Sequence, residues 1–99
     1  GGKPNQGYYV NGVQFDAFDE QSRLLVDAKN WRADGRIVKA LEAGEHWAAW
    51  KVVNQAQEQL RAAKGFPIVW RVASKEAKAV IDPILKGWKF NISVVVVLP

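Results

Sequence analysis

The sequence predicts one domain of the α/β or α+β class, built around one mixed β-sheet. Three observations predict it: strand-like segments fill the first third of the chain, helical periodicity follows from Arg36 to Lys64, and two further strand-like segments enclose a second helical segment. The 99 residues, 48% hydrophobic and 24% charged, have the balance of a globular protein with a single core. We therefore expect residues 1–99 to form one domain, with residues 1–7 as a flexible lead-in.

The first third of the chain predicts an antiparallel meander of three strands over residues 8–29. "YYV" and "VQFDAF" are joined by Asn11-Gly12, which suits a type I′ turn of two residues. "DEQSR" makes the next turn, and "LLVDAKNW" follows as the third strand.

The middle of the chain predicts two helices. Gly44 divides the helical pattern into a short helix and a longer one, which Gly65 ends. In the longer helix one apolar face is expected to pack on the sheet, and it consists of Ala49, Val52, Val53, Ala56, Leu60 and Ala63.

The last third predicts strand, helix and strand. Pro67 fits only the beginning or an edge of the strand "FPIVWRVA". Ser74 is the expected N-cap of "KEAKAVIDPILK", which Pro83 should bend or end. In the final strand, "SVVVVL" is apolar on both faces, which predicts a covered strand within the sheet; left exposed, it would be an edge for docking another chain.

Composition excludes several kinds of chemistry. Without Cys the chain has no disulfide, thiolate metal site or cysteine nucleophile, and the single His46 is too few for a catalytic triad or a His-based zinc site. The sequence has no Gly-rich phosphate-binding loop, and the apolar run "SVVVVLP" is too short to span a bilayer, so no membrane partner is expected. The formal charge of +4 suits a polyanionic partner such as nucleic acid.

Asp16, Asp27 and Lys29 stand out because charged residues are disfavoured in strands. Side chains alternate between the faces of a strand, so these three are expected to emerge together on the face opposite the apolar set. Two carboxylates on adjacent strands can hold Mg²⁺, and a neighbouring Lys can orient or stabilise an attacking hydroxide. The alternative is a solvated outer face on which an Asp–Lys pair contributes little.

The spacing of these residues resembles a known nuclease signature. Asp16, ten intervening residues and then Asp27-Ala28-Lys29 resemble the PD-(D/E)xK motif, and the predicted strand order resembles the restriction-endonuclease core. "YYVNGVQFDAFD", "LLVDAKNW", the Gln-rich helix and "GFPIVWRVAS" together resemble the restriction-endonuclease-fold toxin domains of bacterial polymorphic and type VI secretion effectors, over about residues 8–75.

The resemblance implies a role for each matching residue. Asp16 and Asp27 would ligate Mg²⁺ (or Mn²⁺), the carbonyl of Ala28 would be a further ligand, and Lys29 would assist the nucleophile. Asp19 competes with Asp16 as the first carboxylate, but strand alternation favours Asp16 because a turn begins near Asp19.

The same resemblance implies a contribution from the long helix. Gln55 or Gln59 would help to position the attacking water, whereas Gln57 points elsewhere; the alternative is ordinary helix surface. Among the Trp residues, Trp70 is expected in the core. Trp31, Trp47 and Trp50 are expected to pack in the core or at its boundary, with stacking on bases or packing against a protein partner as the alternatives.

At the level of function, the resemblance implies a metal-dependent nuclease that is the toxic module of a secreted effector. It would act in the cytoplasm of a competing bacterium, with DNA expected before RNA, and a cognate immunity protein would inhibit it in the producing cell. Related nucleases begin with a helix that supplies a Glu, whereas "GGKPNQG" has neither, so either this chain dispenses with that group or an upstream part is missing. The other functions left open are a non-catalytic nucleic-acid-binding module and a protein-binding domain.

Overall fold

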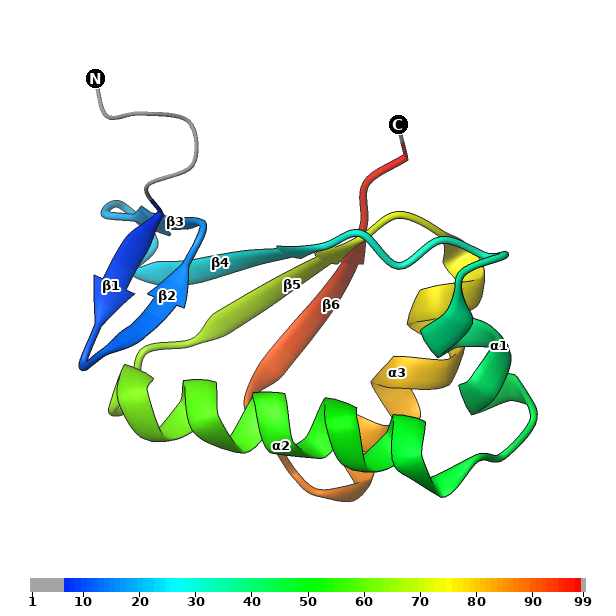
Figure 1. Ribbon diagram of the computed structural model, residues 1–99. Helices are drawn as coiled ribbons and strands as arrows, with labels where there is room; N and C mark the ends of the chain where they lie inside the picture. Colours follow the sequence, from blue (N-terminus) through cyan, green and yellow to red (C-terminus); the bar gives the residue numbers. More distant parts are fainter. Residues whose placement is uncertain (1–6, 99) are drawn as a thin grey trace.

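The computed structural model describes residues 7–98 and contains six strands and three helices within them (Figure 1). In chain order they are β1 (Tyr8–Val10), β2 (Val13–Phe15), β3 (Ala17–Asp19), β4 (Leu24–Lys29), α1 (Arg36–Glu42), α2 (His46–Ala63), β5 (Ile68–Val72), α3 (Lys75–Gly87) and β6 (Ile92–Val96). Residues 1–6 of the expected lead-in lie outside the described residues. The predicted mixed α/β class is confirmed.

The strands form two sheets, so the prediction of one sheet was wrong. A four-stranded mixed sheet has the order β3-β4-β5-β6, in which β3 is antiparallel to β4 and the remaining pairs are parallel; β1 and β2 form a separate antiparallel pair. The expected second strand is divided by a bend at Asp16. There the Asp16 carboxylate accepts a hydrogen bond from the backbone N–H of Ala28. In a regular antiparallel ladder, a backbone carbonyl would accept such a bond. The predicted three-strand meander is therefore four short strands.

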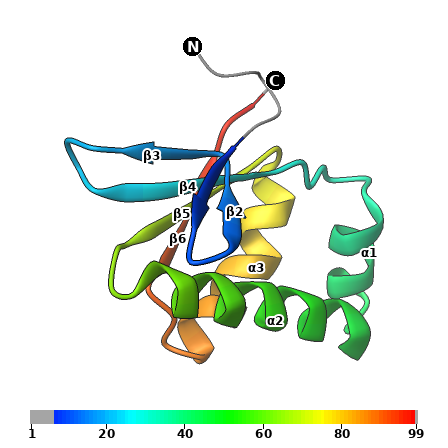
Figure 2. The ribbon, with the colours of Figure 1, turned by 60° about the vertical axis from the view of Figure 1, so that its left-hand side comes forward.

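The β1–β2 hairpin has the predicted turn. Asn11 and Gly12 both have positive φ, 49° and 84°, as a type I′ turn requires. The Asn11 side chain donates to the carbonyl oxygen of Ala62 at 2.6 Å. This bond ties the tip of the hairpin to the last turn of α2, and Figure 2 shows the hairpin reaching from the sheet to that helix.

The helical region contains the two predicted helices, separated at Gly44, where φ is +76°. The long helix ends one residue earlier than predicted, because Lys64 rather than Gly65 is its left-handed C-cap, with φ 49°. Right-handed crossovers that proceed in one direction along a sheet place their helices on the same face. In Figure 1 all three helices accordingly lie on one side of the four-stranded sheet.

The region after β5 confirms the predicted N-cap of the helix and excludes one of the two effects expected of Pro83. Pro67 directly precedes β5, as expected, and the Ser74 hydroxyl accepts the N–H of Ala77 at 3.0 Å as the N-cap of α3. The helix then continues through Pro83 to Gly87, so Pro83 does not end it. Pro83 and the residue four positions before it are both exposed, so water can satisfy the carbonyl that lacks a donor.

The final strand lies at the edge of the sheet, so the prediction of a covered strand was wrong. In β6 the side chains of Ile92 and Val94 are buried, whereas Ser93 and Val95 are exposed on the face that no helix covers. This strand buries only every second side chain. When an exposed position such as 95 also carries Val, the sequence cannot be distinguished from that of a strand that is covered on both faces.

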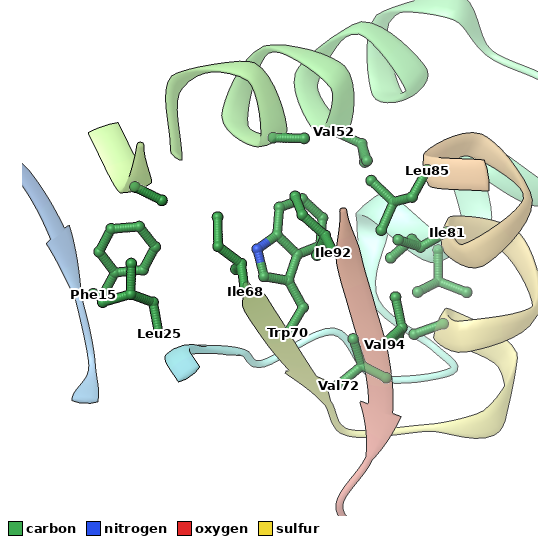
Figure 3. Packing of buried hydrophobic residues seen from close by; sticks show 14 residues of the cluster. Phe15, Leu25, Val52, Ile68, Trp70, Val72, Ile81, Leu85, Ile92 and Val94 are labelled. Atoms are coloured by element: carbon green, nitrogen blue, oxygen red, sulfur yellow. The ribbon is translucent and has the colours of Figure 1, made fainter. Parts of the chain in front are cut away.

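One hydrophobic core lies between the four-stranded sheet and the helices (Figure 3). Trp70 lies at its centre and is fully buried, as predicted, with α2 above it and α3 to one side. The fully buried large side chains are Phe15, Leu25, Val38, Val52, Ile68, Trp70, Val72, Ile81 and Leu85. Within the described part of the chain, no helix is both long and apolar enough to cross a membrane.

Candidate active site

Asp27 and Lys29 lie on the face of β4 that packs beneath α2, not on the opposite face as expected. The register pairs Leu25 with Ile68, Asp27 with Trp70 and Lys29 with Val72, and the three β5 partners are all buried. Strand alternation correctly predicted that Asp27 and Lys29 share one face of β4, but it assigned the core to the opposite face. The reason is that the start of β4 is apolar on both faces, since Leu25 is buried on one and Val26 on the other.

Asp27 and Lys29 form an ion pair that is largely removed from water. Lys29 Nζ lies 2.8 Å from Asp27 Oδ2, and the two side chains are only 15% and 14% exposed. The ammonium also donates to Gln55 Oε1 at 2.5 Å. It lies 5.0 Å from the centroid of the Trp70 ring and 5.6 Å from that of Trp31, within the range of a cation–π interaction. Four groups therefore hold the Lys29 ammonium in one place.

Gln59 connects this ion pair to the centre of the core. Its side chain is 5% exposed; the amide nitrogen donates to Asp27 Oδ2 at 2.6 Å, and the amide oxygen accepts from Trp70 Nε1 at 2.7 Å. Throughout residues 7–98, no buried side-chain nitrogen or oxygen lacks a hydrogen-bond partner. A satisfied network of this kind restricts each member to one orientation. The orientation of the Asp27 carboxylate is thus set by α2 and β5 together.

Asp16 lies on the other side of the β4 backbone from β5. Its N–H donates to the Val26 carbonyl at 2.9 Å, and its Oδ2 accepts the N–H of Ala28 at 2.5 Å. These two bonds bracket Asp27 in the sequence, so the Asp16 carboxylate lies beside the segment that carries Asp27 and Lys29. Because the N–H and C=O of a strand residue point to the same side, the Ala28 carbonyl is directed toward the side of Asp16.

Asp19 is occupied in the turn between β3 and β4. Its Oδ1 accepts the backbone N–H of Gln21 at 3.0 Å, and hydrogen bonds from Ser22, first from the hydroxyl and then from the backbone, hold the pKa of Asp19 below its ordinary value of 3.8. A carboxylate that stabilises a turn is poorly placed to be a ligand elsewhere. The geometry therefore favours Asp16 over Asp19, as alternation predicted.

A cavity of about 200 Å³ opens over the ion pair, and it contains a residue that the sequence did not single out. It is lined by Val13, Gln14, Asp27, Lys29, Gln55, Glu58 and Gln59. The structure therefore joins four of the predicted site residues, adds the carboxylate of Glu58, and leaves Asp16 outside this lining. Glu58 follows Gln55 by three residues, so helical spacing alone would have placed it next to the predicted Gln.

The oxygen donors near Asp27 are of the kind that a divalent cation takes. Within residues 7–98, no three His, Cys, Asp or Glu side chains gather closely enough to hold a metal ion by themselves. Mg²⁺, however, uses one or two carboxylates and completes its shell with water and substrate phosphate. The bonds from Lys29 and Gln59 both go to Oδ2 of Asp27, so Oδ1 takes no part in either. Asp27 Oδ1, the Asp16 carboxylate and the Ala28 carbonyl are the donors that such an ion would use.

Among the described residues, basic side chains line two further concave surfaces near the ion pair. Arg32 and Arg71 line a cavity of about 260 Å³ together with Ala28 and Lys29. Arg36 and Lys51 line a larger groove along α2 that also includes Gln55. Phosphates could therefore reach the ion pair from two directions.

Comparison of the chain with family models, with curated proteins and with solved structures gave no match in any of the three.

Proposed function

We propose that this chain is a metal-dependent nuclease of the PD-(D/E)xK type with a restriction-endonuclease-like core. One observation carries the proposal: Asp27 and Lys29, two residues apart on β4, converge with Gln55 and Gln59 of α2 in a water-depleted network that opens to a cavity. A solvated strand surface, the alternative that the sequence left open, would not remove both charges from water.

Each residue has a specific task in the proposed reaction. Asp16, Asp27 and the Ala28 carbonyl would hold Mg²⁺ or Mn²⁺, which when bound supplies positive charge for the scissile phosphate. The Lys29 ammonium orients the attacking water and offsets the negative charge that develops on phosphorus. Gln55 and Gln59 keep Lys29 and Asp27 in position, so little reorganisation accompanies the chemical step.

The proposal extends to the biological role. The domain would be the toxic module of a secreted bacterial effector, active in the cytoplasm of a competing cell, with DNA as the substrate before RNA. A cognate immunity protein would inhibit it in the producing cell, and an acidic surface on that partner would complement the charge of +4.

Degradation of plasmid DNA and of RNA tests the activity, with Mg²⁺ and with EDTA, for the wild type, Lys29→Met and Asp27→Asn. We expect metal-dependent cleavage that both substitutions reduce by at least about 100-fold, the lower end of what the loss of one preorganised electrostatic stabiliser costs. The controls are Lys86→Met and Asp82→Asn, which alter an ion pair on α3 that is remote from the cavity and has an Nζ–Oδ2 distance of 3.1 Å.

The outcomes separate the proposal from its alternatives. Circular dichroism first establishes that each variant is folded. Cleavage that survives in folded Lys29→Met and Asp27→Asn would remove this site from the chemistry. A folded wild type that binds DNA equally well with EDTA and leaves it intact would be a non-catalytic binding module, and absence of salt-dependent binding would indicate a protein-binding domain.

A further inference from the structure

A groove of about 840 Å³ runs along α2 and ends next to the candidate active site. It is lined by Arg36, Ile37, Trp47, Trp50, Lys51, Asn54, Gln55 and Glu58. Gln55 and Glu58 also line the smaller cavity over Lys29, so the two concave surfaces share a boundary. Gln55, whose side chain accepts from Lys29, is therefore the residue through which a ligand in the groove meets the candidate active site.

The groove residues of α2 form one continuous row on the helix. Positions 47, 50, 51, 54, 55 and 58 repeat at intervals of three and four, which places them on one face. From Trp47 to Glu58 the row is about 16 Å long at ~1.5 Å per residue. At the ~3.4 Å spacing of a stacked strand, that length accommodates about five nucleotides.

Two Trp side chains lie in the first half of this row and remain exposed. Trp50 is 56% exposed and Trp47 is 40% exposed, although each ring could have stabilised the core by burial. Trp47 is held in place: its Nε1 donates to Glu45 at 3.0 Å, and the Arg36 guanidinium lies 5.0 Å from its ring centroid. The ring of Trp50, one turn farther along, carries most of the exposed aromatic surface.

The polar groups of the groove suit a nucleotide strand. Arg36 and Lys51 supply positive charge for phosphates, and the side-chain amides of Asn54 and Gln55 can both donate to and accept from base edges. Base faces are covered inside a duplex, so a ring such as that of Trp50 can stack only on an unpaired base.

We propose that this groove binds an unpaired segment of a nucleic-acid strand through stacking on Trp50, and leads that segment to Lys29. The inference rests on the proposed nuclease function and narrows its substrate to single-stranded or locally unpaired DNA or RNA. The occupant is a nucleic acid rather than a protein because the groove combines two cations with stacking surface and shares Gln55 and Glu58 with the cavity of the proposed phosphate-cleaving site.

Binding is measured by fluorescence anisotropy in EDTA, so that cleavage does not interfere. The probes are short labelled oligo(dT), oligo(U) and a DNA duplex of equal length. The variants are Trp50→Ala and, as the matched control, Trp88→Ala, whose ring is 50% exposed at the far end of α3. We expect the unpaired strands to bind more tightly than the duplex, and Trp50→Ala to weaken that binding about 5- to 150-fold, the range of one lost base–aromatic stack.

Lys51→Gln gives an independent readout through the salt dependence. Removing one phosphate contact to a single strand lowers the slope of log affinity against log salt by about 0.7. Trp50→Ala should leave this slope unchanged because it removes stacking rather than charge. The comparison of oligo(dT) with oligo(U) shows whether DNA or RNA is preferred in the same groove.

The proposal that the groove binds an unpaired strand and the proposal of nuclease activity can be refuted independently. If unpaired strands bind in a Trp50-dependent way but the wild type with Mg²⁺ does not cleave them, the groove proposal stands and the nuclease proposal is overturned. If the protein cleaves nucleic acid with metal but binds duplex and single strand equally well, and Trp50→Ala does not change these affinities, the nuclease proposal stands and the groove proposal is overturned. Absence of binding to every probe would also overturn the groove proposal and leave the two Trp rings as a protein-binding surface.

Discussion

Replacing Asp27 with Asn and Lys29 with Met, singly and together, measures how strongly the two charges stabilise each other. The Nζ–Oδ2 distance is 2.8 Å and both side chains are about 85% removed from water. At that distance two unit charges attract by about 6 kcal/mol at an effective dielectric constant of ~20 and by about 1.5 kcal/mol at ~80. Partial exposure places the pair between these limits, so we expect a coupling free energy of about 2–4 kcal/mol.

Each single substitution leaves one poorly hydrated charge without its partner. We therefore expect each to lower the free energy of unfolding by about 3 kcal/mol, and the double variant to lose about 2–4 kcal/mol rather than the roughly 6 kcal/mol of two independent losses, because neither charge remains unpaired. Urea unfolding, monitored by Trp fluorescence, measures these free energies of unfolding. The comparison requires that the slope of the free energy against urea concentration is the same for all variants. In a domain of this size, 3 kcal/mol corresponds to a fall in Tm of about 12–24 °C.

The half-exposed pair of Asp82 and Lys86 provides the control for this cycle. Its Nζ–Oδ2 distance is similar, 3.1 Å, and its Asp82 side chain is 20% exposed, but the Lys86 side chain is 78% exposed, whereas that of Lys29 is 15% exposed. The corresponding Asn and Met substitutions should give a coupling below about 0.5 kcal/mol, as for exposed helix pairs. If the pair of Asp27 and Lys29 couples no more strongly than this control, the reasoning from burial is refuted.

Two further predictions concern the surroundings of the pair. Trp70→Phe removes the donor to Gln59 and leaves a buried amide oxygen unsatisfied, which costs about 1–3 kcal/mol; in urea unfolding the loss should exceed that of Trp31→Phe, and an equal loss would count against the network. For Asp19, whose pKa the bonds from Ser22 lower, the stability that the ionised form contributes is present above pH 3.8 and lost as pH falls through the lower folded-state value. Wild type should therefore exceed Asp19→Asn in stability near pH 6, with a difference that shrinks toward pH 2, and a pH-independent difference would contradict the linkage.

Local signals in the sequence predicted most of the elements. The turn at Asn11-Gly12, the break at Gly44 and the cap at Ser74 each depend on the backbone preferences of one or two residues, so they can be inferred without the fold. The errors arose where tertiary contacts decide. The bend at Asp16 depends on a bond to Ala28, which is distant in the sequence, and the continuation of α3 through Pro83 depends on which side of the helix faces water.

Strand alternation selected Asp27 and Lys29, and the family resemblance implied Gln55 and Gln59; the structure brings these four together and leaves Asp16 outside the cavity. Alternation cannot tell which face of a strand helices will cover when both faces begin with apolar residues. Glu58 was missed because a lone carboxylate on a helix is indistinguishable from solvated surface until the sheet beneath it is known.

The position of the ion pair itself argues for a function. Along the same face of the sheet, β5 carries Ile68, Trp70 and Val72, so apolar residues at positions 27 and 29 would extend the core and avoid the desolvation of two charges. The chain instead adds Gln55 and Gln59 to satisfy them. A second departure from the most stable arrangement, the exposed pair of Trp rings, lies on the same helix in a groove that borders the first. Local conflicts with stability are expected at functional sites. Because Gln55 both contacts Lys29 and lines the groove that contains the Trp rings, one shared ligand explains the two departures better than two independent accidents of packing.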